Sequence, residues 1–109
     1  MELTAAQRKQ FAEDGYLIFP ELFSPVEVAI LREEADRVSK IEADCIFREG
    51  ESGQAKSMFR LHEKDGPTAS PAYRAASRTP RVLGVAQQVL GDDALYLHHC
   101  KVNMKAAIE

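Results

Sequence analysis

The residues best suited to chemistry lie in one stretch, Tyr96–Lys105, with the sequence YLHHCKVNMK. Two histidines and a cysteine stand side by side in it. Alternate residues of a β-strand share a face, so His98 and His99 point to opposite sides. His98 and Cys100 do share a face, but they supply only half of a tetrahedral zinc ligand set, and no second Cys/His pair stands elsewhere. The pattern therefore favours half-polar core residues over a zinc centre.

The same alternation gathers three polar side chains, Lys101, Asn103 and Lys105, on the face that also carries His99. Polar groups in a row are costly in a dry core. This face therefore either meets water or lines a cavity for a polar ligand. Lysines and an amide suit a carboxylate, which prefers charge-assisted hydrogen bonds. The residues alone leave both interpretations open.

A strand over residues 94–105 must be positioned by other elements, and its largely apolar face should pack on a core. We expect this face to comprise Tyr96, His98, Cys100, Val102 and Met104. The apolar runs at 45–47 and 58–61 predict two further strands, joined by a polar loop. The final strand is expected to pair with residues 58–61. A short strand over residues 16–19 is also predicted, ended by Pro20.

Capping signals predict two helices in the first half of the chain. Thr4 and Gln7 form one capping box and Ser24 and Glu27 another, while Gly15 is a C-terminal stop signal. The second helix should bury an apolar face and pair oppositely charged residues four apart on its other face. The predicted face is Val28, Leu31, Ala35 and Val38, and the predicted pair is Glu33 with Arg37.

Two more helices are predicted, from residues 70–71 to 77 and from 79–80 to 90, with Gly91 as the final stop. The second should bury an apolar face made of Val82, Leu83, Ala86, Val89 and Leu90. Strands do not alternate regularly with helices in this order. The sequence therefore predicts an α+β domain whose helices brace a sheet.

Composition excludes several classes of function. The 109 residues carry a net charge of −3 and no basic stripe, which argues against a nucleic-acid partner. No apolar run approaches the ~20 residues of a membrane span. The N-terminus lacks the apolar core of a signal peptide, so Cys45 and Cys100 are expected to be reduced thiols in the cytoplasm.

The last four residues, AAIE, add no further strand or helix signal after the final predicted strand. A strand edge with an apolar face promotes aggregation unless something covers it. We expect the chain to be the front part of a longer protein. The alternative is an acceptable exposed edge, which could also pair with a second copy in a homodimer.

Two segments resemble the phytanoyl-CoA dioxygenase family. The first, LTAAQRKQFAEDGYLIFPELFSPVEVAILREEADRV, has the capped helix, the Asp-Gly-Tyr-Leu turn, the proline and the Ser-Pro-capped helix typical of that family's N-terminal part. The second, RTPRVLGVAQQVLGDDALYLHHCKVNMK, has a helix ending in Leu-Gly and a strand with Asn103 and Lys105. The resemblance covers nearly the whole chain and is loosest over residues 41–68.

The resemblance implies the helical N-terminal part and first strands of a double-stranded β-helix (jelly roll), incomplete in this chain. It implies an N-terminal portion, residues 1–109, of a dioxygenase that uses Fe(II) and 2-oxoglutarate to hydroxylate a small organic substrate. Iron in such enzymes is held by two histidines and a carboxylate. The family's His-x-Asp motif does not occur in this sequence. We therefore expect no catalysis by this chain alone.

Site residues carried over from the family are expectations about individual positions. Asn103 and Lys101 are expected to contact the cosubstrate, and His99, Lys105 and His62 the substrate. Met58 and Phe59 either approach the substrate or pack in the core.

Two other functions remain open: a truncated, non-catalytic binding or dimerisation module, and a small α+β protein with an unrelated ligand. A sharply melting dimer would favour the first of these. Full solvation of the Lys101/Asn103/Lys105 face would favour the second.

Overall fold

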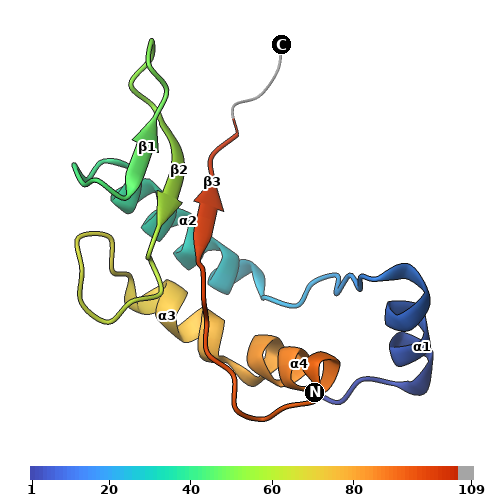
Figure 1. Ribbon diagram of the computed structural model, residues 1–109. Helices are drawn as coiled ribbons and strands as arrows, with labels where there is room; N and C mark the ends of the chain where they lie inside the picture. The colour runs from blue at the N-terminus through green and yellow to red at the C-terminus, as the bar shows by residue number, and fades with distance from the viewer. Residues whose placement is uncertain (106–109) are drawn as a thin grey trace.

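The computed structural model describes residues 1–105, which form four helices and a three-stranded sheet. Their order confirms the predicted α+β class (Figure 1). The elements are α1 (Ala5–Asp14), α2 (Pro25–Ser39), β1 (Ile46–Arg48), β2 (Ala55–Phe59), α3 (Pro71–Arg78), α4 (Pro80–Leu90) and β3 (Lys101–Asn103).

The sheet is antiparallel, with the strand order β1-β2-β3. Met58 at its centre pairs with Ile46 on one side and Val102 on the other. The predicted pairing of the last strand with the second middle strand is thus confirmed. One face of the sheet packs against α2, where Val38 joins Ile46, Met58 and Leu61 in the buried core.

The helix ends follow the local signals. Both capping boxes form, with the backbone N–H of Gln7 donating to Thr4 at 3.1 Å and that of Glu27 to Ser24 at 3.2 Å. Gly15 ends α1 with φ +79° and Gly91 ends α4 with φ +68°, backbone conformations that favour glycine.

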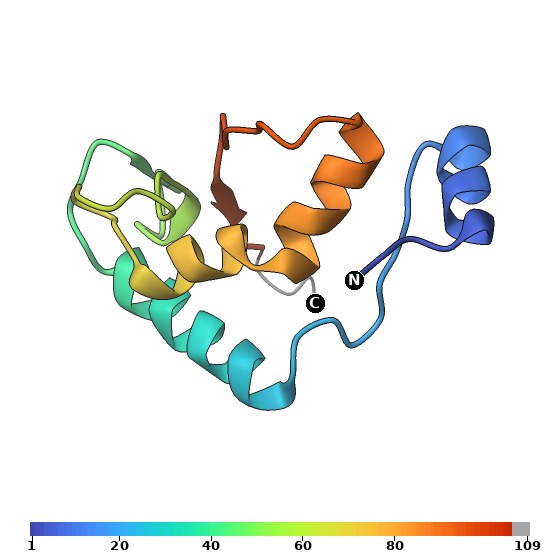
Figure 2. The same ribbon diagram turned by 90° about the horizontal axis from the view of Figure 1, so that it is seen from below.

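The α1 helix lies apart from the other elements and is joined to α2 by an extended segment (Figure 2). It buries no residue of its own. It is attached to α4 through Gln88, whose side chain accepts hydrogen bonds from the N–H of the buried Leu3 at 2.7 Å and from the guanidinium of Arg8 at 3.3 Å.

Two predicted strands are corrected. Residues 16–19 are extended but pair with no strand among residues 1–105, and Ile18 is 74% exposed. The final strand is only Lys101–Asn103 rather than 94–105. Its partner β2 ends at Phe59 because Arg60 has a positive φ of 72°, which breaks the ladder.

The shortened strand changes which residues reach the core. Cys100, Val102 and Met104 pack against it as predicted. Tyr96 is 85% exposed and His98 is also exposed, so their predicted packing is wrong. Residues 94–100 are irregular, so strand alternation does not govern them.

The helices bury less than their patterns predicted. Val28, Val82 and Leu90 are exposed, whereas Val38 is fully buried. On α2, Arg37 pairs with Glu34 rather than Glu33. Glu34 is also held in place by the Ser70 hydroxyl, which donates to its carboxylate at 2.7 Å.

Candidate functional site

The face of the sheet directed away from α2 brings polar and aromatic side chains together. Ser57 on β2 pairs with Asn103 on β3, and Phe59 pairs with Lys101. Alternation places the side chains of these paired residues on the same face. We call this surface the outer sheet face: Phe47, Ser57, Phe59, His99, Lys101 and Asn103.

Aromatic contacts link the members of the outer sheet face. The Phe59 ring lies 5.6 Å from that of Phe47 and 5.2 Å from that of His99, centroid to centroid. The Lys101 ammonium lies 5.6 Å from the Phe59 centroid, within the range of a cation–π interaction. The result is an apolar patch with a cation at its edge.

The amide of Asn103 is oriented by its strand neighbour. The Ser57 hydroxyl donates to Asn103 Oδ1 at 3.4 Å. This contact occupies the acceptor of the amide and leaves its NH₂ group to donate elsewhere. No ion pair found among residues 1–105 includes Lys101 or Lys105. Amide donors beside uncompensated cations suit a carboxylate ligand.

The structure brings some predicted site residues together and separates others. Asn103, Lys101 and His99 share the outer sheet face. Lys105 lies just past β3 and lines an adjoining hollow that also includes Asn103. His62 lies elsewhere, in a cavity beside α3 and α4. Met58 is fully buried, which confirms its core interpretation.

Sequence reasoning missed Phe47 and Ser57 as members of this face. Phe47 is 58% exposed although it belongs to an apolar run. Alternation within each strand could have placed Phe47 and Ser57 opposite their buried neighbours, Ile46 and Met58. The cross-strand register, which sets Ser57 against Asn103, carries no signal in the sequence.

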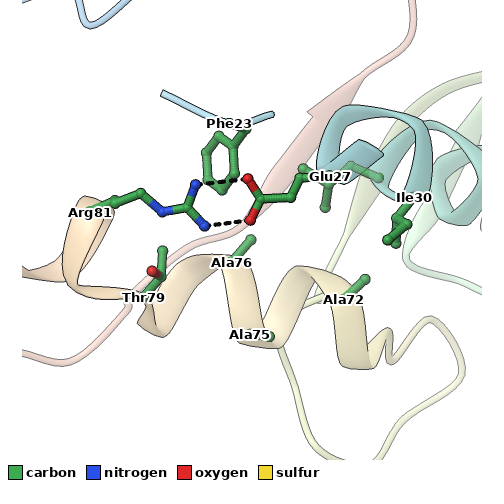
Figure 3. Close-up of a pocket in the computed structure, with 9 residues that line it drawn as sticks. Phe23, Glu27, Ile30, Ala72, Ala75, Ala76, Thr79 and Arg81 are labelled. Carbon is green, nitrogen blue, oxygen red and sulfur yellow. Dashed lines mark hydrogen bonds and ion pairs between the residues drawn. The ribbon is translucent and has the colours of Figure 1, made fainter. Parts of the chain in front are cut away.

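A second hollow, of about 340 Å³, lies between α2 and α3 (Figure 3). An ion pair stands at one end of it, where Arg81 donates to the two carboxylate oxygens of Glu27 at 2.8 and 2.5 Å. The Arg81 guanidinium also lies 4.8 Å from the Phe23 ring centroid and donates to the Leu22 carbonyl at 2.8 Å. These contacts tie α4 to the start of α2.

The Arg81 hydrogen bonds lower the pKa of Glu27 to about 2, and its contacts with Ser24 act in the same direction. The carboxylate is therefore ionised at neutral pH, and both of its oxygens accept hydrogen bonds from Arg81. A group so fixed is poorly suited to proton transfer, because general acids and bases need a pKa near the working pH. We interpret the pair as structural.

The described residues hold no candidate metal centre. Within residues 1–105, no three His, Cys, Asp or Glu side chains come together as they would around a metal ion. The same part of the chain contains no helix long and apolar enough to cross a membrane.

No protein-family profile matches the chain. Comparison with curated proteins finds ectoine dioxygenases. That of Nocardia farcinica is 34% identical over 106 residues, covering 94% of this chain and 34% of the relative. That of Stutzerimonas stutzeri is 33% identical, covering 89% and 32% respectively. The chain thus spans about a third of the length of these relatives.

The chain is also similar to part of the solved structures of an ectoine dioxygenase, EctD. The structure of EctD from S. alaskensis with 2-oxoglutarate and 5-hydroxyectoine superposes with a TM-score of 0.79 at 30% identity, covering 93% of this chain and 35% of that one. The structure of the same enzyme with bound Fe gives a TM-score of 0.80. The resemblance to the phytanoyl-CoA dioxygenase family is confirmed by these similarities.

Proposed function

We propose that this chain is the N-terminal portion, residues 1–109, of an Fe(II)- and 2-oxoglutarate-dependent dioxygenase that hydroxylates ectoine or a similar small molecule. The observation that carries the proposal is the outer sheet face. It offers amide, cationic and aromatic groups on one surface, in a chain similar to an enzyme solved with 2-oxoglutarate and 5-hydroxyectoine. The strands would be the first of a jelly roll that the rest of the protein completes.

In this proposal Asn103 and Lys101 bind the cosubstrate. The Asn103 NH₂ donates to a carboxylate of 2-oxoglutarate, and Ser57 holds the amide in the orientation that permits this. Lys101 adds a positive charge over the Phe59 ring. Amide and ammonium donors together bind a carboxylate more strongly than neutral donors would.

The substrate would lie against the aromatic part of the same face. Phe47, Phe59 and His99 form its floor, and Lys105 stands at the end of β3. His62 is the site residue least compatible with this arrangement, because it lines a different cavity. Its proposed contact would require a ligand that extends beyond the sheet.

Residues 1–105 do not fit an iron centre, and we derive no step through the metal from them. Iron, when bound, supplies the oxygen chemistry of this class. This chain would orient the cosubstrate and shield the reacting groups from water. We propose that it is not catalytic alone.

The two cysteines of this chain are free thiols, which fits the proposed cytoplasmic location.

The test is a chimera in which this chain replaces the matching third of S. alaskensis EctD. We expect ectoine hydroxylation that depends on Fe(II) and 2-oxoglutarate, measured by mass spectrometry of the product. The 109-residue chain alone, under the same conditions, should give no product. A folded, iron-loaded chimera without turnover would contradict the proposal, and so would turnover by the chain alone.

A dimerisation module is the second candidate, favoured by the position of β3 at the edge of the sheet. Its outer backbone groups have no strand partner within residues 1–105, and a second copy could supply one. Sedimentation velocity distinguishes the two proposals. A stable, sharply melting dimer that Asn103→Pro converts to a folded monomer would support the module, because the Asn103 N–H faces away from β2.

A further inference from the structure

A separate cavity of about 510 Å³ lies between α3, α4 and the segment that follows α4. In Figure 2 the segment that follows α4 runs back past α4 and α3 toward the sheet. The volume falls within the roughly 300–1,000 Å³ typical of small-molecule sites. The lining residues are His62, Arg74, Ser77, Arg78, Val82, Leu83, Ala86, Leu90, Leu95, Tyr96 and Leu97.

The lining is polar along α3 and apolar along α4. Arg74, Ser77 and Arg78 are spaced at i, i+3 and i+4, so one face of α3 presents all three. Opposite them, α4 contributes aliphatic side chains such as Leu83, and Leu95 comes from the segment after it. A ligand that satisfied both walls would carry a polar head and an apolar body.

The polar wall is cationic and lacks a balancing charge. No ion pair found in the described residues, 1–105, includes Arg74 or Arg78. Arg74 makes one hydrogen bond, to the His62 carbonyl at 3.4 Å, which leaves most of its guanidinium donors for other partners. Two arginines on one helix face repel each other, so an anion between them would be stabilising.

His62 provides an independent indication. Its Nδ1 is buried and has no hydrogen-bond partner in the structure. A buried polar atom without a partner is costly, and such exceptions in native proteins call for an explanation. The His62 side chain lines the cavity, so a small rotation of its ring toward a bound ligand would let a ligand oxygen accept a hydrogen bond from this nitrogen and remove the cost.

We propose that this cavity binds a medium-chain organic monocarboxylate, with its head at Arg74, Arg78 and His62 and its hydrocarbon chain along α4. The carboxylate matches the forked donors of arginine. The apolar wall disfavours inorganic phosphate and dicarboxylates, which would leave it unfilled. The cavity shares no lining residue with the outer sheet face, so ligand binding here can be tested separately from cosubstrate binding there.

The test is a titration of the isotope-labelled 109-residue chain with octanoate, followed by amide chemical shifts. We expect saturable binding with shifts centred on Ser77 and Leu95, and at least tenfold weaker binding of octanol, which lacks the charge. 2-Oxoglutarate should not compete. Equal affinity for octanoate and octanol would overturn the proposal, as would shifts confined to other parts of the chain.

Variants assign the binding to the arginines. Arg78→Gln is the primary variant, because Arg78 is exposed and its side chain forms no ion pair with any of residues 1–105. We expect it to weaken octanoate binding at least tenfold and to leave octanol binding unchanged. Arg32→Gln, an exposed arginine on α2 outside the cavity, is the matched control. Unchanged binding in a folded Arg78→Gln protein would refute the assignment.

Discussion

The two faces of the sheet differ sharply although the same three strands form both. The inner face buries Ile46 and Met58 against α2, and Met58 is wholly inaccessible to solvent. The outer face exposes Phe47 and keeps Lys101 and Asn103 at the surface. Apolar burial explains the inner face, whereas exposed rings beside a cation and an amide are costly without a role in binding. Stability should therefore depend on one face and ligand binding on the other.

The largest expected effect comes from comparing two adjacent residues of β2, Met58 and Phe59, whose side chains lie on opposite faces of the sheet. Met58→Ala should lower the free energy of unfolding by about 2–5 kcal/mol, because it leaves a cavity in the core. Phe59→Ala should cost clearly less, since its ring lies on the outer face. Urea denaturation followed by circular dichroism measures both. Equal losses would show that the outer face is as much a packing surface as the inner one.

The pH dependence of stability should reveal a stabilising contribution from Glu27, which lies outside both faces of the sheet. The pKa of Glu27 is about 2 in the folded state and about 4.5 when the group is unpaired. Its contribution to stability is therefore present above pH 4.5 and is lost as the pH falls from 4.5 to about 2. Thermal melts between pH 2 and 6 should show this decline. Glu27→Gln should flatten it, and an unchanged slope would exclude Glu27 as the cause.

A smaller effect should come from Ser57, whose hydroxyl orients the Asn103 amide. In the chimera, Ser57→Ala should raise KM for 2-oxoglutarate by about 2- to 10-fold, because one neutral hydrogen bond contributes about 0.5–1.5 kcal/mol. The value of kcat should change little. Steady-state kinetics at saturating ectoine give both constants. An effect confined to KM for ectoine would instead assign Ser57 to the substrate.

Features encoded locally could be predicted from the sequence. The capping residues Thr4 and Ser24 and the stop at Gly91 act within one turn of their helix, so their patterns were sufficient. The alternation Lys101, Asn103 likewise placed both side chains on one face.

Features set by tertiary contacts could not be predicted. The positive φ of Arg60 ends β2, shortens β3 and directs His62 away from the sheet, and no glycine marks that position. The register that joins Ser57 to Asn103 depends on the same pairing. The Arg60 backbone conformation and the strand register decide which of the predicted site residues lie together. The residues that form the outer sheet face could therefore be identified only from the structure.

The central claim is that the outer sheet face binds 2-oxoglutarate, and Asn103→Ala in the chimera tests it most directly. Gln10→Ala, which removes an exposed amide from the distant α1, is the matched control. Loss of a hydrogen bond to a charged group costs about 1.5–3 kcal/mol, so KM for 2-oxoglutarate should rise roughly 10- to 100-fold. The control should leave it unchanged. A folded Asn103→Ala chimera with an unaltered KM for 2-oxoglutarate would contradict the claim.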